Sequence, residues 1–492
     1  MTLTSLFIDN ENVTAQDQRT FERRNPVSGQ LASTGVCASP KDAVRAVEAA
    51  SRAFGAWSAT GPGERRALLN KAADALEALR PALVKAMKDE TGASTLWCQF
   101  NVSTAVGIVR EAAAITTQIS GQVIPSDLPG NISMAMRQPA GVVLGIAPWN
   151  APGILGVRAI ATPLACGNTV ILKGSEICPA SHRLLVDAFH HAGFAPGVVN
   201  FIIHAPEDAG TVVSAMIAHK AVRRVNFTGS TKVGKIIGLK CAEHLKPALL
   251  ELGGKAPFVV LDDADLDQAA EAAAFGAFMH SGQICMSTER FVVDASVADA
   301  FCERLTAKAT ALRPDTTSSA IASVVDMSTV LRCNALIDDA LAKGATLLCG
   351  GRATSTLMQP TLLDHVTTDM ESYKEEIFGP VLQIVRAANF EEALALPTKH
   401  QYGNGVAIFT RNGHAAREFA ARVNVGMVGI NVPIPVPVAY HSFGGWKRSA
   451  FGDTNQYGME GIKFWTKVKT VTARWPDGSH DGANSFIIPT MG

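Results

Sequence analysis

The chain has 492 residues, of which 47% are hydrophobic and 18% charged. A chain of this length exceeds one hydrophobic core of ordinary size, so two or three domains are expected. Lysine plus arginine and aspartate plus glutamate each total 44, so the formal net charge is zero and no global field attracts nucleic acid or an anionic membrane.

The sequence carries no charged start followed by an apolar run and a small-residue cleavage site, and apolar stretches are interrupted well before about 18 residues. We therefore expect a soluble, cytoplasmic protein without a membrane partner. The nine cysteines are an odd number and lack C-x-x-C spacing, which disfavours a disulfide framework and a structural zinc site. Most cysteines should be free thiols, and no metal is predicted.

In the first part of the chain, apolar residues at helical spacing predict amphipathic helices over 40–56 and 63–90. From residue 141 apolar strands alternate with helices, which is the form of repeated βαβ units. The expected strands are 141–150, 168–173, 197–203 and 223–229, and the expected helices are 153–165, 179–193, 207–219 and 230–245. Such continuous apolar strands favour a parallel sheet covered on both faces.

A second α/β pattern follows residue 250 and predicts a second domain of similar construction. Its helices are expected near 265–280 and 296–312, and its strands at 290–294 and near 345 and 381. The stretch 313–325 is small and polar, so it is expected to form an exposed connection.

The stretch FTGSTKVGKI at 227–236 resembles a phosphate-binding loop. Gly229 to Lys235 fits the triphosphatase motif, but Ile236 stands where Ser or Thr would bind Mg²⁺, which argues against that class. Gly229 lies where a predicted strand ends and a helix begins, a setting that suits a dinucleotide. Because the G-x-G-x-x-G turn is absent, a plain β-to-α turn stays open as the alternative.

Three residues could carry chemistry, and each has an ordinary alternative. Cys285 could be a nucleophile, because a thiolate attacks carbonyl carbon readily, or it could be a packed thiol. Glu251 ends an apolar strand and could activate water, or it could be a solvated carboxylate. Asn150 could donate to a developing oxyanion, or it could cap the following helix.

Seven short stretches, in order along nearly the whole chain, together resemble the aldehyde dehydrogenase superfamily. They are PWN at 148–150, KGSE at 173–176, FTGS at 227–230, LELGGK at 250–255, SGQICM at 281–286, EEIFGP at 375–380 and FGGWKRS at 443–449. The resemblance implies the aldehyde dehydrogenase fold, an α/β class with a Rossmann-like dinucleotide-binding domain, a second α/β catalytic domain and a small β oligomerisation element. The implied boundaries are 1–123 and 141–250, then 251–447, and 124–140 with 463–492.

The same resemblance implies the roles of the catalytic residues. Cys285 would be the nucleophile, Glu251 the general base, and Asn150 with the Cys285 backbone N–H would hold the oxyanion. Residues implied at the cofactor are Trp149, Lys173, Glu176, Gly229, Ser230, Leu252, Glu376 and Phe378. A carboxylate at Glu176 suits the ribose hydroxyls and repels a 2′-phosphate, so NAD is expected, with NADP as the weaker alternative.

The substrate signals are mixed. Residues from STLW at 94–97 through SGQICMSTER resemble salicylaldehyde and benzaldehyde dehydrogenases, whereas 425–458 resemble methylmalonate-semialdehyde dehydrogenase, an acylating branch that uses coenzyme A. That branch lacks the glutamate and carries Arg before its nucleophile, whereas this chain has Glu251 and Ile284. We therefore expect an aromatic aldehyde and release of the free acid. Implied substrate residues are Trp97, Arg158, Ile284 and Met286, and Arg110 and Arg158 are the candidate partners for a substrate carboxylate.

Two alternatives stay open, one within enzymes and one outside them. The first is a coenzyme A acylating semialdehyde dehydrogenase, and the second is a non-catalytic binding or structural protein on the same fold. The intact Cys285, Glu251 and Asn150 argue against the second. For the aldehyde dehydrogenase a homodimer or homotetramer is expected, as in the family.

Overall fold

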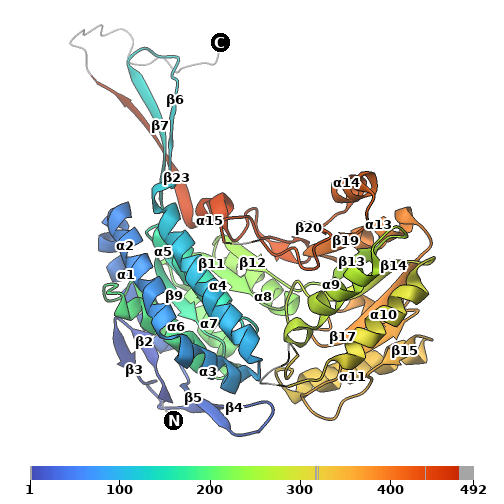
Figure 1. The fold of residues 1–492 in the computed structure, drawn as a ribbon. Helices are drawn as coiled ribbons and strands as arrows, with labels where there is room; N and C mark the ends of the chain where they lie inside the picture. The colour runs from blue at the N-terminus through green and yellow to red at the C-terminus, as the bar shows by residue number, and fades with distance from the viewer. Residues whose placement is uncertain (1–2, 316–318, 320, 438, 476–492) are drawn as a thin grey trace.

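The computed structural model describes residues 3–315, 319, 321–437 and 439–475. Two large sheets, each covered by helices, form the body, and a narrow arm of strands stands away from it (Figure 1). This arrangement confirms the predicted α/β class with a small additional β element.

The first sheet has eight strands, with five parallel strands at its centre. In order across the sheet they are β22 (Ala450–Phe451), β12 (Ala248–Glu251), β11 (Val222–Thr228), β8 (Val142–Ile146), β9 (Thr169–Lys173), β10 (Val199–Ile202), β2 (Leu6–Ile8) and β3 (Glu11–Val13). The chain runs from β8 to β10 and then returns to the other side of β8. Open sheets of this kind bind ligands at the carboxyl edge where the direction reverses, here between β8 and β11.

Helices cover both faces of this sheet, so β8, β9 and β10 are buried along their whole lengths. α5 and α6 connect β8 to β10, α7 and α8 connect β10 to β12, and α2, α3 and α4 pack outside α5 and α6. The bounds are α1 (Pro40–Ala59), α2 (Pro62–Ala78), α3 (Arg80–Thr91), α4 (Thr95–Ala114), α5 (Pro152–Ala165), α6 (Pro179–His191), α7 (Ala209–Ala218) and α8 (Thr231–Glu243).

The second sheet has seven strands, which are parallel except at the β15 edge. Its order is β15 (Thr346–Cys349), β16 (Thr361–Asp364), β17 (Val381–Ala387), β14 (Thr288–Asp294), β13 (Ala256–Val260), β19 (Gly405–Phe409) and β20 (Met427–Ile430). Its helices are α9 (Leu266–Phe278), α10 (Ala298–Ala311), α11 (Met327–Ala342), α12 (Glu371–Lys374), α13 (Phe390–Lys399) and α14 (Gly413–Arg422).

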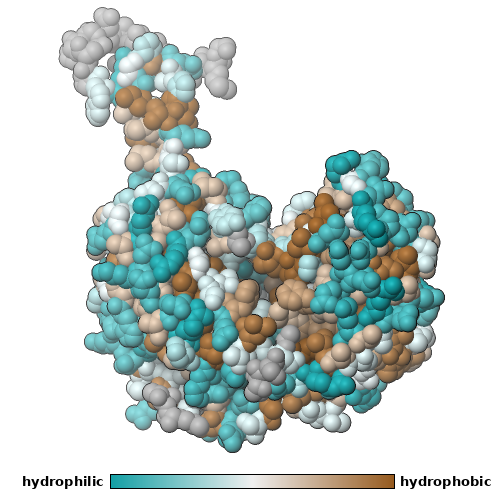
Figure 2. Space-filling model, viewed as in Figure 1, coloured by the Kyte–Doolittle hydropathy of each residue, from teal (hydrophilic) through white to brown (hydrophobic). Residues whose placement is uncertain are grey.

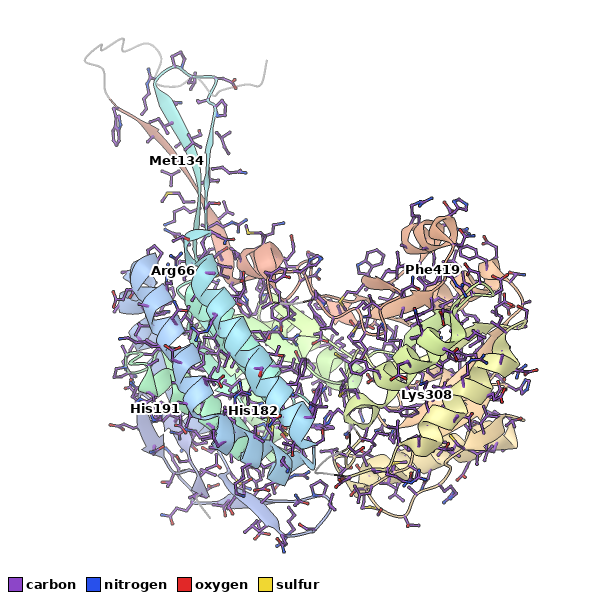
Figure 3. The ribbon with its side chains drawn as sticks, viewed as in Figure 1. Arg66, Met134, His182, His191, Lys308 and Phe419 are labelled. Carbon is purple, nitrogen blue, oxygen red and sulfur yellow. The ribbon has the colours of Figure 1, made fainter. Side chains whose placement is uncertain are left out.

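The arm is an antiparallel sheet of β6 (Gln122–Ile124), β7 (Asn131–Pro139) and β23 (Thr466–Arg474), with β7 in the middle. Met134 on β7 lies well away from the helical body (Figure 3). Apolar side chains are exposed along the arm and appear brown in Figure 2; they include Val123, Ile124, Ile132, Met136 and Val468. The sequence placed this element at 124–140 and 463–492, of which 476–492 lie outside the described residues.

Smaller elements complete the description. They are the sheet of β1 (Leu3–Thr4), β5 (Leu31–Val36) and β4 (Thr20–Arg24), the pair β18 (Tyr402–Gly403) and β21 (Trp446–Lys447), the helix α15 (Gly458–Trp465), and the short 3-10 turns Ile115–Thr117, Pro206–Asp208 and Met279–Gly282. None of the described helices combines the length and apolar character that a bilayer crossing requires.

Two sequence-based expectations need correction. The helix predicted over 63–90 is two helices, because the chain leaves helical geometry at Leu79, just before Pro81 in the next helix's first turn. The exposed connection predicted at 313–325 is wrong for 321–325, which are buried. Ile321 joins the core of the second sheet, and the backbone N–H of Ser323 donates to the Gly92 carbonyl.

Residues 252–255 link the two sheets directly, because β12 ends at Glu251 and β13 begins at Ala256. The carboxyl ends of the first sheet therefore meet the amino ends of the second. Cys285 precedes β14, and the EEIFGP segment precedes β17, so both lie at that amino edge. The connection places segments more than a hundred residues apart in sequence at one junction.

Candidate active site

A sharp left-handed turn leads into the Cys285 loop. His280, Ser281 and Gly282 have φ values of 51°, 56° and 72°, after which the chain reverses from α9 toward β14. A Cβ at position 282 would lie 2.5 Å from the carbonyl oxygen of Gly379, so glycine is required there for space as well as for φ.

The backbone of residues 321–325 holds this turn in place through hydrogen bonds. Ser281 Oγ donates to the Ala322 carbonyl at 2.8 Å and accepts from the Ala322 N–H at 3.1 Å. Gln283 Oε1 accepts from the Val325 N–H at 2.9 Å. The sequence did not predict that Ser281, Gln283 and residues 321–325 hold the turn before Cys285. The apolar run IASVV at 321–325 was the one signal that these residues are buried.

Cys285 is partly exposed at the junction between the sheets. Its carbonyl oxygen accepts from Asn404 Nδ2 at 3.2 Å, and it lies so near Gly254 that a Cβ there would press into it. Burial raises the pKa of the Cys285 thiol well above its usual value, the nearby Glu251 carboxylate raises it further, and Arg158 opposes both effects. Thiolate formation at Cys285 therefore depends on the charges around it.

Glu251 is buried at the end of β12 and forms an ion pair with Arg158 of α5. Arg158 Nη2 lies 2.5 Å from Glu251 Oε2 and donates also to Thr228 Oγ1 at 2.6 Å. Both side chains are at most 3% exposed. Arg158, predicted as a substrate-side cation, is thus already paired with the predicted base.

Asn150 ties the end of β8 to the Cys285 loop. Its Nδ2 donates to the Gln283 carbonyl at 3.0 Å, and its own carbonyl accepts from Trp97 Nε1 at 2.9 Å. The Trp97 ring stacks on His280, with centroids 4.8 Å apart. Burial lowers the pKa of His280 to about 3, so this ring is neutral against Trp97. The three predicted catalytic residues are therefore brought together.

A second buried ion pair fixes the EEIFGP segment. Lys255 Nζ lies 2.7 Å from Glu289 Oε2, and the Glu289 carboxylate accepts from the backbone N–H groups of Ile377 and Phe378, at 2.9 Å and 2.8 Å. The segment then places Glu376 Oε1 2.8 Å from the Gly254 N–H. Burial and the charge of Glu289 raise the pKa of Glu376 to about 8.

The other residues predicted at a cofactor lie along the carboxyl edge of the first sheet. Trp149 meets Phe378 edge to face, with centroids 5.8 Å apart. Ser230 caps α8, where its Oγ accepts from the Val233 N–H, and Gly229 N donates to the Glu251 carbonyl. Leu252 is buried against Gly234 of α8, so it supports the turn rather than lining an open surface.

Lys173 is the last residue of β9, and Glu176 follows just beyond the end of that strand. Lys173 Nζ lies 3.4 Å from Glu176 Oε2, and the carboxylate is partly exposed. Burial opposes the charge on Glu176, but Lys173 outweighs it, so the pKa of Glu176 is lowered. The structure therefore holds an ionised carboxylate at this edge.

The residues predicted at the substrate do not all reach the same surface. Ile284 is partly exposed beside Cys285, whereas Met286 is buried against Gly405. Arg110 is exposed on α4 and pairs with Asp74 at 2.7 Å, so it lies outside the cluster around Cys285. A cavity of about 730 Å³ lies elsewhere, between α8, the β22 edge and Phe464.

Comparison with known sequences identifies the family in which this site occurs. Residues 13–471 match the sequence profile of the Aldehyde dehydrogenase family. The chain belongs to this family. Aldehyde dehydrogenases of the family use NAD or NADP. The described residues contain no group of three or more His, Cys, Asp or Glu arranged to hold a metal ion.

Three relatives show how the enzyme is related within the family. It is 53% identical over 470 residues to a vanillin dehydrogenase of Pseudomonas fluorescens, covering 95% of this chain and 97% of the relative. The crystal structure of a salicylaldehyde dehydrogenase from Pseudomonas putida complexed with salicylaldehyde has a TM-score of 0.94 and 42% identity, covering 96% and 98% of the two chains. A malonate-semialdehyde dehydrogenase of Pseudomonas aeruginosa is 36% identical over 493 residues, covering 98% of each.

Proposed function

We propose that this aldehyde dehydrogenase oxidises aromatic aldehydes to carboxylic acids, with NAD as the preferred cofactor and Cys285 as the nucleophile. The observation that carries the proposal is the convergence of Cys285, Glu251 and Asn150 at the junction of the two sheets. Family membership supports the aldehyde chemistry, and similarity to enzymes named for vanillin and salicylaldehyde supports the aromatic class.

Cys285 and Asn150 would act in the first step. The Cys285 thiolate adds to the aldehyde carbon, so a C–S bond forms and the carbonyl π electrons move to oxygen. An amide nitrogen carries two hydrogens, and only one from Asn150 is used on the Gln283 carbonyl. The second, together with the Cys285 N–H, would donate to the oxyanion, and losing such a donor typically costs about 10² to 10³ in rate.

The carboxyl edge of the first sheet suits a dinucleotide. The N-terminus of the 13-residue helix α8 follows the Gly229–Ser230 turn, where N–H groups and the helix dipole favour a pyrophosphate. Glu176 would accept from ribose hydroxyls at one end, and Glu376, with a pKa of about 8, would share hydrogen bonds with ribose hydroxyls at the other. When bound, the nicotinamide supplies the hydride acceptor for the thiohemiacetal on Cys285.

Glu251 would carry out the last step. It accepts a proton from water as the water oxygen attacks the thioester carbon on Cys285; the C–S bond then breaks, and the acid and the free thiolate are produced. Glu251 is buried within range of the Cys285 thiol, which suits this role. The presence of this base favours hydrolysis over transfer to coenzyme A.

The surroundings of Cys285 favour an uncharged substrate. Ile284, which is partly exposed beside Cys285, is apolar, and Arg158 is already paired with Glu251. A substrate carboxylate brought to this position would be left without a cation, which typically costs several kcal/mol. An aromatic ring has no such penalty and gains from burial against apolar side chains.

We also propose that the enzyme is a homo-oligomer, with the arm of β6, β7 and β23 forming part of the interface. Its exposed apolar side chains, and the outer edges of β6 and β23, which pair with no other strand among the described residues, would be covered by a second copy. The outer face of α8 is a second candidate, because Val233, Ile236 and Leu239 are exposed there.

Replacing the nucleophile should abolish oxidation while binding of the cofactor persists. Cys285→Ala removes the group that forms the covalent bond, but leaves Lys173, Glu176 and the Gly229 turn intact. We expect less than a few per cent of wild-type turnover, with NAD affinity by fluorescence titration within about twofold of wild type. Cys349→Ala changes the other partly exposed thiol, and Cys166→Ala and Cys178→Ala change buried ones; all three should be nearly silent. Substantial turnover in Cys285→Ala would remove Cys285 from the mechanism.

A panel of aldehydes should rank aromatic substrates first. We expect kcat/KM for benzaldehyde and salicylaldehyde to exceed that for methylmalonate semialdehyde by at least about tenfold, or roughly 1.4 kcal/mol in transition-state binding. NADH formation is followed with and without coenzyme A, and products are separated chromatographically. The acylating alternative predicts the reverse order, faster turnover with coenzyme A and an acyl thioester product.

Neutralising Glu176 should weaken the preference for NAD. In Glu176→Gln the repulsion of a 2′-phosphate is removed, so the ratio of kcat/KM for NAD to that for NADP should fall several-fold. Glu243→Gln is the matched control, because Glu243 pairs with Lys240 at the same i,i+3 spacing but on an exposed part of α8. A ratio unchanged by Glu176→Gln would show that this carboxylate does not face the ribose.

A further inference from the structure

The Arg158–Glu251 ion pair is buried at the centre of the site. The two atoms Arg158 Nη2 and Glu251 Oε2 are 2.5 Å apart, and the side chains are 3% and 2% exposed. Burying two charges carries a desolvation cost that their attraction often fails to repay, so such a pair is weak evidence of a contribution to stability. Its position beside Cys285 points instead to a role in the reaction.

Several elements converge on Arg158. The guanidinium carbon lies 5.4 Å from the ring centroid of Phe443 and 5.8 Å from that of Tyr457. Both rings belong to 425–458, the segment that resembles the acylating branch. Thr228 at the end of β11 accepts a second hydrogen bond from the same nitrogen that binds Glu251. Arg158 is thereby fixed in one orientation toward the end of β12.

The charged and titratable groups that face Cys285 explain how the orientation of Arg158 affects the thiol. Glu251 raises the pKa of the thiol, Glu376 adds to the rise, and Arg158 lowers it. The buried Tyr457 phenol borders the same pair, and burial raises its pKa, so it stays neutral. The first step needs a thiolate at Cys285 and the last needs a carboxylate at Glu251, and these two negative charges repel each other. Arg158 is the positive charge among the groups acting on Cys285.

We propose that Arg158 is a positioning residue, which holds the Glu251 carboxylate beside Cys285 and compensates its charge so that the neighbouring thiol can ionise. This inference rests on the proposed function, in which Cys285 is the nucleophile and Glu251 the base. It replaces the sequence-based role of Arg158 as a partner for a substrate carboxylate. It also gives residues 443–457 a role, because the rings of Phe443 and Tyr457 lie against the Arg158 guanidinium. The segment would thus serve an enzyme that hydrolyses its thioester.

The thiol titration can be measured without turnover. Wild type and variants, free of aldehyde, are treated with iodoacetamide across a pH series, and alkylation of the Cys285 peptide is quantified by mass spectrometry. In Arg158→Met the midpoint of alkylation should move up by about one pH unit or more, which means roughly tenfold slower alkylation below both midpoints. Arg110→Met is the matched control and should leave the midpoint unchanged, because Arg110 pairs with the distant Asp74.

Two further variants keep the test decisive if Arg158→Met fails to fold. Glu251→Gln should move the midpoint down, opposite in sign, because it removes the negative charge beside the thiol. The double variant Arg158→Met/Glu251→Gln leaves no unpaired buried charge, and its midpoint should lie above that of Glu251→Gln alone. Equal midpoints for these last two, or an unshifted Arg158→Met with a raised KM for carboxylated aldehydes only, would overturn the inference. If wild-type Cys285 is not alkylated at all, the proposed function fails instead.

Discussion

The close approach of two sheets at residues 252–255 is the constraint on which the site depends. This link has no helix and no room for side chains on its glycines. A Cβ at Gly254 would press into the Cys285 carbonyl oxygen, and one at Gly253 would lie 2.8 Å from Glu376 Oε2. Because these glycines carry no Cβ, the loop before β14 and the segment before β17 both reach the end of β12. A single link thus brings together Cys285, Glu251 and Glu376, which are the proposed nucleophile, base and cofactor-binding carboxylate.

Charge balance is the second organising feature. Buried or partly buried carboxylates at the junction have cationic partners: Glu251 with Arg158, Glu289 with Lys255, and Glu176 with Lys173. Glu376 differs, since it accepts from the Gly254 N–H and its pKa rises to about 8. If Glu376 binds ribose hydroxyls as proposed, a raised pKa at this position would make that interaction depend on pH near neutrality. The other carboxylates are paired, and Glu289 also fixes the backbone of the EEIFGP segment by accepting from the Ile377 and Phe378 N–H groups.

Much of this arrangement could be predicted from the sequence, because it depends on local pattern. Alternating apolar strands and helices predicted the parallel sheets, and the resemblance to the family singled out Asn150, between β8 and α5, and Glu251, at the end of β12. The partner of Glu251 could not be found in the same way. Arg158 lies on a different element 93 residues away, and nothing in the apolar run of α5 indicates which way its side chain points. A cation near a predicted substrate site was therefore read as a substrate ligand.

The burial of 321–325 was missed for a related reason. Serine and threonine in 316–319 made the stretch look exposed, whereas Ile321, Val324 and Val325 pack inside and the backbone binds the Ser281 and Gln283 side chains. Met286 was expected beside the substrate because it neighbours Cys285, but residues 284–287 form a turn closed by the Ser287 N–H donating to the Ile284 carbonyl, and Met286 lies in the core against Gly405. Proximity in sequence predicts which loop carries a residue, but it does not predict where the side chain of that residue points.

The most direct test of the account is whether an acyl group accumulates on Cys285 when Glu251 cannot accept a proton. Glu251→Gln is mixed with benzaldehyde and NAD, and the protein is quenched at intervals for peptide mass spectrometry. We predict a burst of about one NADH per active subunit, slow further turnover, and a benzoyl thioester confined to the peptide that contains Cys285. Unchanged steady turnover with no adduct, or an adduct on a different cysteine, would contradict the account.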